Sequence, residues 1–244
     1  MLRRLRKFGL YAKAEKCEFH TDTTEYLGYV LSPSGLTMAP EKIQAIQDWP
    51  EPRKVKDIQL FLRFTNFYHH FIPEYSKITV PLMRLTRKDA LWNFDAKCRN
   101  AFNALKSAFT TAPILAHYTP DAQLVVETDA SDYAIAAILS QWQNGELHPL
   151  AFFSRTMTAT ELNYNVHDKE LLAISSAFST WRHYIEGTAL PVDVVTDHKN
   201  LEYFSTTKML NCRQACWSEF LSAFNMVICF QPGCLGAKPD LLTR

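Results

Sequence analysis

The sequence predicts an α/β (α+β) protein with a mixed sheet in its C-terminal half and a smaller, mainly helical region before it. Apolar residues recur at helical spacing between about residues 40 and 111. After Pro120, valine-rich runs alternate with turn signals and helical stretches instead. The chain has 244 residues, of which 47% are hydrophobic, so it can bury the core of one full domain and a smaller one.

The first 37 residues are predicted to form a basic helix and a short pair of strands. Six positive charges against one negative charge in the first sixteen residues could lie along phosphates, or could form the solvated face of a helix. Alternation over residues 26–31 precedes a turn signal at residues 32–35. Because a helix and one hairpin cannot close a core alone, we expect further structure upstream.

Short helices separated by prolines are predicted over residues 40–89, and another helix over about residues 96–111. Aromatic residues between Phe61 and Phe71 interleave with basic ones. Such interleaving can bind nucleic acid. The core of a helical bundle beside a solvated face gives the same pattern, and we favour the core interpretation.

The C-terminal half is predicted to contain three strands in a meander, then helix, strand, helix and strand. The strands are expected over residues 123–128, 134–141, 149–154, 192–196 and 225–230, and the helices over about 160–186, 200–205 and 214–223. Asn144 and Gly145 indicate a hairpin between the second and third strands, with a loop expected to exceed two residues.

Two aspartates, Asp129 and Asp197, each follow a threonine that ends a valine-rich strand. Ligands bind beyond the carboxyl ends of parallel strands, so neighbouring strands would direct both carboxylates into one crevice. Either aspartate alone could simply begin a loop.

Two further acids complete a candidate metal site. Glu170 lies on or beside the apolar stripe of the long helix, where a carboxylate needs a cation, a metal or a proton. Lys169 and Lys199 are possible salt-bridge partners. Asp240 follows Pro239 and suits a helix start, where it could also be a cap. Clustered carboxylates of this kind favour Mg²⁺ or Mn²⁺, and two such ions can hydrolyse a phosphodiester.

Composition excludes several other classes. No apolar window is long enough for a membrane span, and the first residues lack the apolar stretch of a signal peptide, so we expect a soluble intracellular protein in a cytoplasmic particle or the nucleus. Six cysteines without a CxxC pair favour reduced thiols over a zinc site. Sequence leaves the oligomeric state open.

Several ordered motifs resemble gypsy-type long-terminal-repeat retrotransposon polyproteins. The segments that resemble their ribonuclease H domain are TDASDYAIAAILSQ, HPLAFFSRTMTATELNYNVHDKELLAI, WRHYIEG, VVTDHKNLEYF and GAKPDLLTR. The segments that resemble the end of the palm and the thumb of the same reverse transcriptase are KCEFHTDTTEYLGYVLSPSGL, KIQAIQDWPEP and FTNFYHHFIPEYSKI. The resemblance implies a ribonuclease H-like five-stranded mixed sheet with flanking helices over 119–244, a helical thumb-like region over 38–118 and a palm remnant over 1–37.

The resemblance also implies hydrolysis of the RNA strand of an RNA/DNA hybrid with two Mg²⁺ or Mn²⁺ ions. Asp129 would bridge both ions, Asp240 would complete the site of the ion that activates water, and Glu170 and Asp197 would hold the ion beside the leaving 3′ oxygen. His198 would assist proton or product movement. The missing fingers and palm would be partners, and without a Tyr-x-Asp-Asp turn we expect no polymerase activity.

Departures from the family pattern support an alternative function. The family tends to carry arginine at six positions that are occupied here by His69, His70, Cys212, Cys216, Cys229 and Cys234. Loss of these charges weakens phosphate binding. The alternative is a decayed, catalytically silent fragment that only binds nucleic acid. A transposase or integrase is disfavoured, because the order Asp, Glu, Asp, Asp is that of ribonuclease H.

Overall fold

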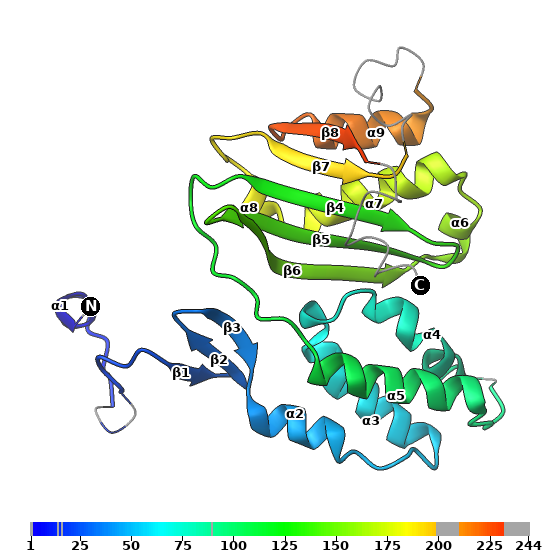
Figure 1. Ribbon diagram of the computed structural model, residues 1–244, viewed down its shortest axis with the longest axis horizontal. Helices are drawn as coiled ribbons and strands as arrows, with labels where there is room; N and C mark the ends of the chain where they lie inside the picture. Colours follow the sequence, from blue (N-terminus) through cyan, green and yellow to red (C-terminus); the bar gives the residue numbers. More distant parts are fainter. Residues whose placement is uncertain (1, 14, 16, 89, 199–209, 232–244) are drawn as a thin grey trace.

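The computed structural model describes residues 2–13, 15, 17–88, 90–198 and 210–231. The described residues form a mixed sheet of five strands with flanking helices, preceded by a helical region and a small antiparallel sheet (Figure 1). The predicted fold class is therefore confirmed. No helix in these ranges is both long and apolar enough to cross a membrane.

The N-terminal segment begins with helix α1 (Leu2–Lys7), none of whose residues is buried. Strands β1 (Thr24–Tyr26), β2 (Tyr29–Ser32) and β3 (Gly35–Met38) then form an antiparallel sheet. The prediction of a single strand pair was incomplete. Leu27 and Gly28 have positive φ angles of 53° and 78°, so the alternating run is divided by a turn between β1 and β2.

The helical region contains α2 (Pro40–Gln47), α3 (Val55–Phe67), the 3-10 helix η2 (His69–Phe71), α4 (Tyr75–Leu85) and α5 (Ala96–Thr110). Phe61 and Phe71 are fully buried in the core of this region, which confirms the core interpretation for them. Phe67 lies at the surface with 49% of its area exposed. The aromatic run therefore supplies both core and surface.

The main sheet has the strand order β6-β5-β4-β7-β8. Its strands are β4 (Leu124–Ala130), β5 (Ala134–Gln143), β6 (Glu146–Thr156), β7 (Val192–Thr196) and β8 (Met226–Phe230). The first three form the expected meander, and β7 and β8 add parallel strands beside β4. The expectation of a longer hairpin loop was wrong: Asn144 and Gly145, with φ angles of 53° and 83°, are the entire connection.

The predicted helix over 160–186 is divided into α6 (Ala159–Leu162), α7 (Val166–Thr180) and α8 (Arg182–Ile185). The Asn165 side chain accepts a hydrogen bond from Asp168 N at 2.8 Å and starts α7 afresh. The predicted helix over 214–223 is α9 (Cys212–Leu221), which begins with a capping box at Asn211. The helix expected over 200–205 lies outside the described residues.

Helices cover both faces of the main sheet. Leu139 packs with Leu171 and Phe178 of α7 in one core cluster. The next residue back, Ile138, points to the opposite face and joins Phe61 in the core of the helical region. The helical region and the sheet thus share a core, and α4 lies beside the β6 edge (Figure 1). The domain boundaries drawn from the sequence stay a prediction.

Candidate functional site

The aspartates predicted to share a crevice lie on neighbouring parallel strands. Strand β4 pairs with β7 so that Val126 faces Val194 and Glu127 faces Val195. Continuing this register by two residues brings Asp129 alongside Asp197. Asp197 directly follows β7, as expected, whereas Asp129 lies inside β4, which continues to Ala130. Asp129 is therefore held by the ladder rather than by a loop.

Glu170 reaches these aspartates from α7. It is only 3% exposed, and its Oε1 accepts a hydrogen bond from Ala130 N at 3.1 Å. Its Oε2 is buried without a hydrogen-bond partner among the described residues. Burial raises the pKa of Glu170 to about 8, and the charges of Asp197 and Asp129 add to the rise. Because no cationic side chain among the described residues pairs with this carboxylate, its surroundings favour a proton or a bound cation.

Asp129 belongs to the same electrostatic cluster. Burial raises its pKa, the charge of Lys77 opposes the rise, and the charge of Asp197 adds to it. The structure therefore brings Asp129, Glu170 and Asp197 together, while Asp240 lies outside the described residues. The alternative pairing of Glu170 with Lys169 is absent from the ion pairs of the described residues, and Lys199 lies outside them.

A divalent metal ion fits the chemistry of this cluster in part. In the described part of the chain, no group of three His, Cys, Asp or Glu side chains is already arranged around a metal position. The donors present are nevertheless hard carboxylate oxygens, and the Glu170 Oε2 lacks a partner. Their mutual repulsion is the interaction that a bound cation relieves.

Two histidines adjoin the acids. His198, which sequence reasoning singled out, follows Asp197 and donates its backbone N–H to Thr196 Oγ1 at 3.3 Å. Its ring meets that of His167 edge to face, with ring centroids 4.2 Å apart. His167 lies in the first turn of α7, and its side chain is exposed.

The N-terminal turn of α7 is tied to α9. Asp168, 3% exposed, accepts hydrogen bonds from Arg213 at 3.1 Å and Gln214 at 2.8 Å. The Arg213 guanidinium also lies 3.7 Å from the centroid of the Tyr164 ring. These contacts fix the turn that precedes Glu170, so α9 helps to set where that carboxylate stands.

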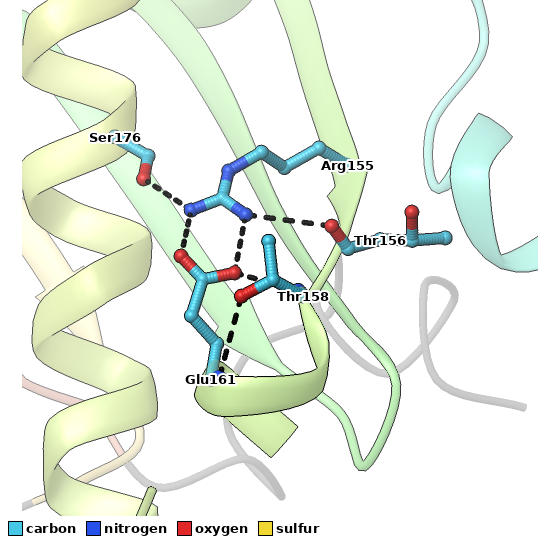
Figure 2. Close-up of polar contacts among 5 residues, drawn as sticks. All are labelled: Arg155, Thr156, Thr158, Glu161 and Ser176. Carbon is cyan, nitrogen blue, oxygen red and sulfur yellow. Dashed lines mark hydrogen bonds and ion pairs between the residues drawn. The ribbon is translucent and has the colours of Figure 1, made fainter. Parts of the chain in front are cut away.

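A second set of contacts fixes the segment between β6 and α7. The Arg155 guanidinium donates to both carboxylate oxygens of Glu161, at 2.8 Å each, and to Ser176 Oγ at 3.4 Å (Figure 2). Glu161 also accepts from the Thr158 N–H at 2.7 Å. The hydrogen bond from Arg155 lowers the pKa of Glu161 to about 2. Arg155 thus joins β6, α6 and α7.

The helical region contributes charged residues that sequence reasoning missed. Glu74 and Lys77 at the start of α4 form an ion pair of 2.9 Å, and both interact electrostatically with Asp129. No local pattern marks them, because they are near Asp129 only through tertiary packing. The positive φ angle of 51° at Glu74 is visible only in the structure, because no pattern in the sequence indicates it.

The strand order β6-β5-β4-β7-β8, in which three antiparallel strands are followed by two parallel ones, defines a ribonuclease H-like fold, and comparisons with known proteins agree. Residues 94–192 match the family model described as an RNase H-like domain found in reverse transcriptase. The Tf2-3 and Tf2-4 transposon polyproteins of Schizosaccharomyces pombe are each 35% identical to this chain over its full length. The chain spans 18% of the length of these relatives.

Two solved structures share the fold. A foamy viral protease-reverse transcriptase in complex with an RNA/DNA hybrid has a TM-score of 0.71 at 22% identity, over 93% of this chain and 31% of that one. The same kind of protein in complex with double-stranded DNA has a TM-score of 0.70 at 22% identity, over 87% and 45%. The chain therefore belongs to the family of RNase H-like domains found in reverse transcriptase and is similar along its full length to retrotransposon polyproteins, in agreement with the resemblance described above. Membership of this family indicates hydrolysis of nucleic acid as the general class of activity.

Proposed function

We propose that the chain hydrolyses the RNA strand of RNA/DNA hybrids, using Asp129, Glu170, Asp197 and Asp240 to hold two Mg²⁺ or Mn²⁺ ions. The observation that carries the proposal is the buried Glu170 carboxylate, whose Oε2 lacks a hydrogen-bond partner among the described residues and which lies beside Asp129 and Asp197. Because a buried carboxylate without a partner is unfavourable in its charged form, we expect Glu170 to bind a cation. The choice of hybrid as substrate is supported by the RNA/DNA hybrid bound to a foamy viral reverse transcriptase of the same fold.

The residues have separate tasks in this proposal. Bound divalent ions would activate a water and stabilise the leaving 3′ oxygen of the phosphodiester. The β4 ladder fixes Asp129, and Ala130 N orients Glu170 by donating to its Oε1. Asp197 would supply its carboxylate from the end of β7, and Asp240 would complete the set. His198, in ring contact with His167, assists proton or product movement at the edge of the acids.

Cleavage of an end-labelled RNA/DNA hybrid with Mg²⁺ tests the proposal. We expect metal-dependent RNA cuts by the wild-type chain and none by Asp129→Asn, which keeps the side-chain shape and removes the charge. Double-stranded DNA is the substrate control and should remain intact. Equal RNA cleavage by both proteins, or none by either, would contradict the proposal. Extension of a primer is not expected, because the sequence contains no Asp-Asp pair.

A second candidate is binding of nucleic acid without cleavage, as in a decayed element copy. The observation that favours it is exposure of Cys212 and Cys216 on α9, where the family tends to carry arginine. Retained hybrid affinity together with absent cleavage would support this candidate over the first.

A further inference from the structure

The start of α4 is fixed against the main sheet. The Ser76 N–H donates to Ser154 Oγ of β6 at 2.9 Å. Glu74, two residues before Ser76, is the N-cap residue of α4 and has a left-handed backbone conformation, with φ 51° and ψ 26°. A residue with a side chain adopts this conformation at a cost of roughly 1 kcal/mol, which the surroundings must offset. The hydrogen bond between Ser76 and Ser154 holds this turn beside β6.

The side chains at this turn form an ion pair that is partly accessible. Lys77 Nζ lies 2.9 Å from Glu74 Oε1, with 39% of the Lys77 side chain exposed and 15% of the Glu74 side chain. Burial raises the pKa of Glu74, its bond to Lys77 opposes the rise, and the charge of Asp129 adds to it. Ser154, which accepts the Ser76 hydrogen bond, pairs with Ala136 of β5, and Ala136 pairs with Asp129 of β4. The start of α4 is therefore attached to the row of residues across the sheet that contains Asp129, and the charges of Glu74 and Lys77 act on Asp129.

An anionic substrate needs a cation near this cluster. A phosphodiester strand that reaches three carboxylates is repelled by each of them. An ammonium group carries three donors, so Lys77 can keep its bond to Glu74 and still donate to a phosphate oxygen. The exposed part of the Lys77 side chain leaves room for such a contact.

We propose that Lys77 is a phosphate-binding residue of the acid site, contributed by the helical region and positioned by Glu74. The ligand is a phosphate of the nucleic-acid strand whose scissile bond lies at Asp129, so the identity of that strand rests on the proposed function. The competing explanation is structural: Lys77 only neutralises Glu74 and Asp129 and never contacts a ligand. The two explanations differ in the effect of Lys77 on binding of a phosphate strand.

The test compares Lys77→Gln, Lys77→Arg and Glu74→Gln with the wild-type full chain. Affinity for an RNA/DNA hybrid is measured against salt without divalent ions, so that binding is separated from cleavage. Loss of one phosphate contact should reduce the slope of log K against log salt by about 0.7 to 0.9 for Lys77→Gln. Lys77→Arg should keep the wild-type slope. Lys97→Gln, which changes an exposed lysine on α5, is the matched control and should leave the slope unchanged.

Cleavage with Mg²⁺ adds a second readout. We expect Lys77→Gln to raise KM about tenfold with a smaller change in kcat, Lys77→Arg to recover most of that loss, and Glu74→Gln to fall between them. Melting temperatures verify folding, and Lys77→Met, which keeps the aliphatic stem, replaces the Gln variant if that variant unfolds.

The outcomes separate this proposal from the proposed function. A wild-type chain that binds but does not cleave the hybrid overturns the proposed function, while a lower slope for Lys77→Gln still supports the phosphate contact. Cleavage by the wild type with an unchanged slope and KM in Lys77→Gln overturns the role of Lys77 alone. A wild-type chain without measurable affinity for the hybrid overturns both.

Discussion

Replacement of Glu170 by glutamine should stabilise the metal-free protein at neutral and alkaline pH. Burial beside Asp197 and Asp129 raises the pKa of Glu170 from 4.5 to about 8. The folded state therefore binds more protons than the unfolded state between these values, and the free energy of unfolding falls as pH rises through that window. At about 1.36 kcal/mol per pH unit, the full shift corresponds to an upper bound of about 5 kcal/mol.

The assay is denaturant unfolding of wild type and Glu170→Gln in chelator, at pH 4.5, 6, 7 and 8.5. Glutamine carries no titrating group, so its stability lacks this contribution. We expect the stability difference between the variant and the wild type to grow by at least about 2 kcal/mol between pH 4.5 and 8.5, within the bound set by the pKa shift. The growth of the difference matters, because other groups titrate equally in both proteins.

Metal addition supplies the functional half of the experiment. Under the proposed function, Mg²⁺ stabilises the wild type by binding the folded state, and Glu170→Gln loses most of that gain together with hybrid cleavage. A stability difference that stays constant between pH 4.5 and 8.5 would refute the inference that Glu170 is an uncompensated buried carboxylate. A variant that gains as much from Mg²⁺ as the wild type would refute its role as a metal ligand.

Three further predictions concern the surroundings of the acids. Glu161→Gln should lower the free energy of unfolding by about 1 to 2 kcal/mol at pH 7, because Arg155 lowers the pKa of Glu161 to about 2. The stability from this pair is present above pH 4.5 and is lost as pH falls toward 2. In denaturant unfolding, the difference between wild type and variant should therefore be smaller at pH 3 than at pH 7. Asp168→Asn should cost roughly 2 kcal/mol in the same assay and lower hybrid cleavage, since it weakens the bonds from Arg213 and Gln214 that fix the start of α7; unchanged stability would contradict this. Replacement of exposed Cys212 and Cys216 by arginine should steepen the salt dependence of hybrid affinity, by up to about 0.7 to 0.9 per new phosphate contact, and an unchanged slope would show that α9 does not face the strand.

Local patterns in the sequence predicted the sheet because its strands carry their own signals. The Asn144 and Gly145 pair fits positive φ angles, and it turns β5 directly into β6. Asp129 and Asp197 could be placed together from sequence because each follows a threonine in a valine-rich strand, and the carboxyl ends of neighbouring parallel strands lie at one edge of a sheet. Glu170 could be placed on the inward face because apolar residues around it recur at helical spacing.

Competing local interactions explain the wrong boundaries. Apolar residues continue at helical spacing on both sides of Asn165, so periodicity predicted one long helix. The Asn165 side chain instead caps the backbone of a new helix at Asp168 N. At the other end of the chain, the alternation through Leu27 and Gly28 hid a turn, because both residues adopt positive φ angles that the pattern does not encode.

Two features that are unfavourable for stability occur in residues whose charges interact with Asp129. Glu170 is buried with one oxygen unpartnered among the described residues, and Glu74 holds a left-handed backbone at the start of α4. A chain selected for stability alone would replace the first with an apolar residue and the second with glycine. Local choices that conflict with stability are expected where a ligand later repays them. Because these two lie on different elements, from the helical region and from α7, their convergence supports a site that both parts of the chain build together.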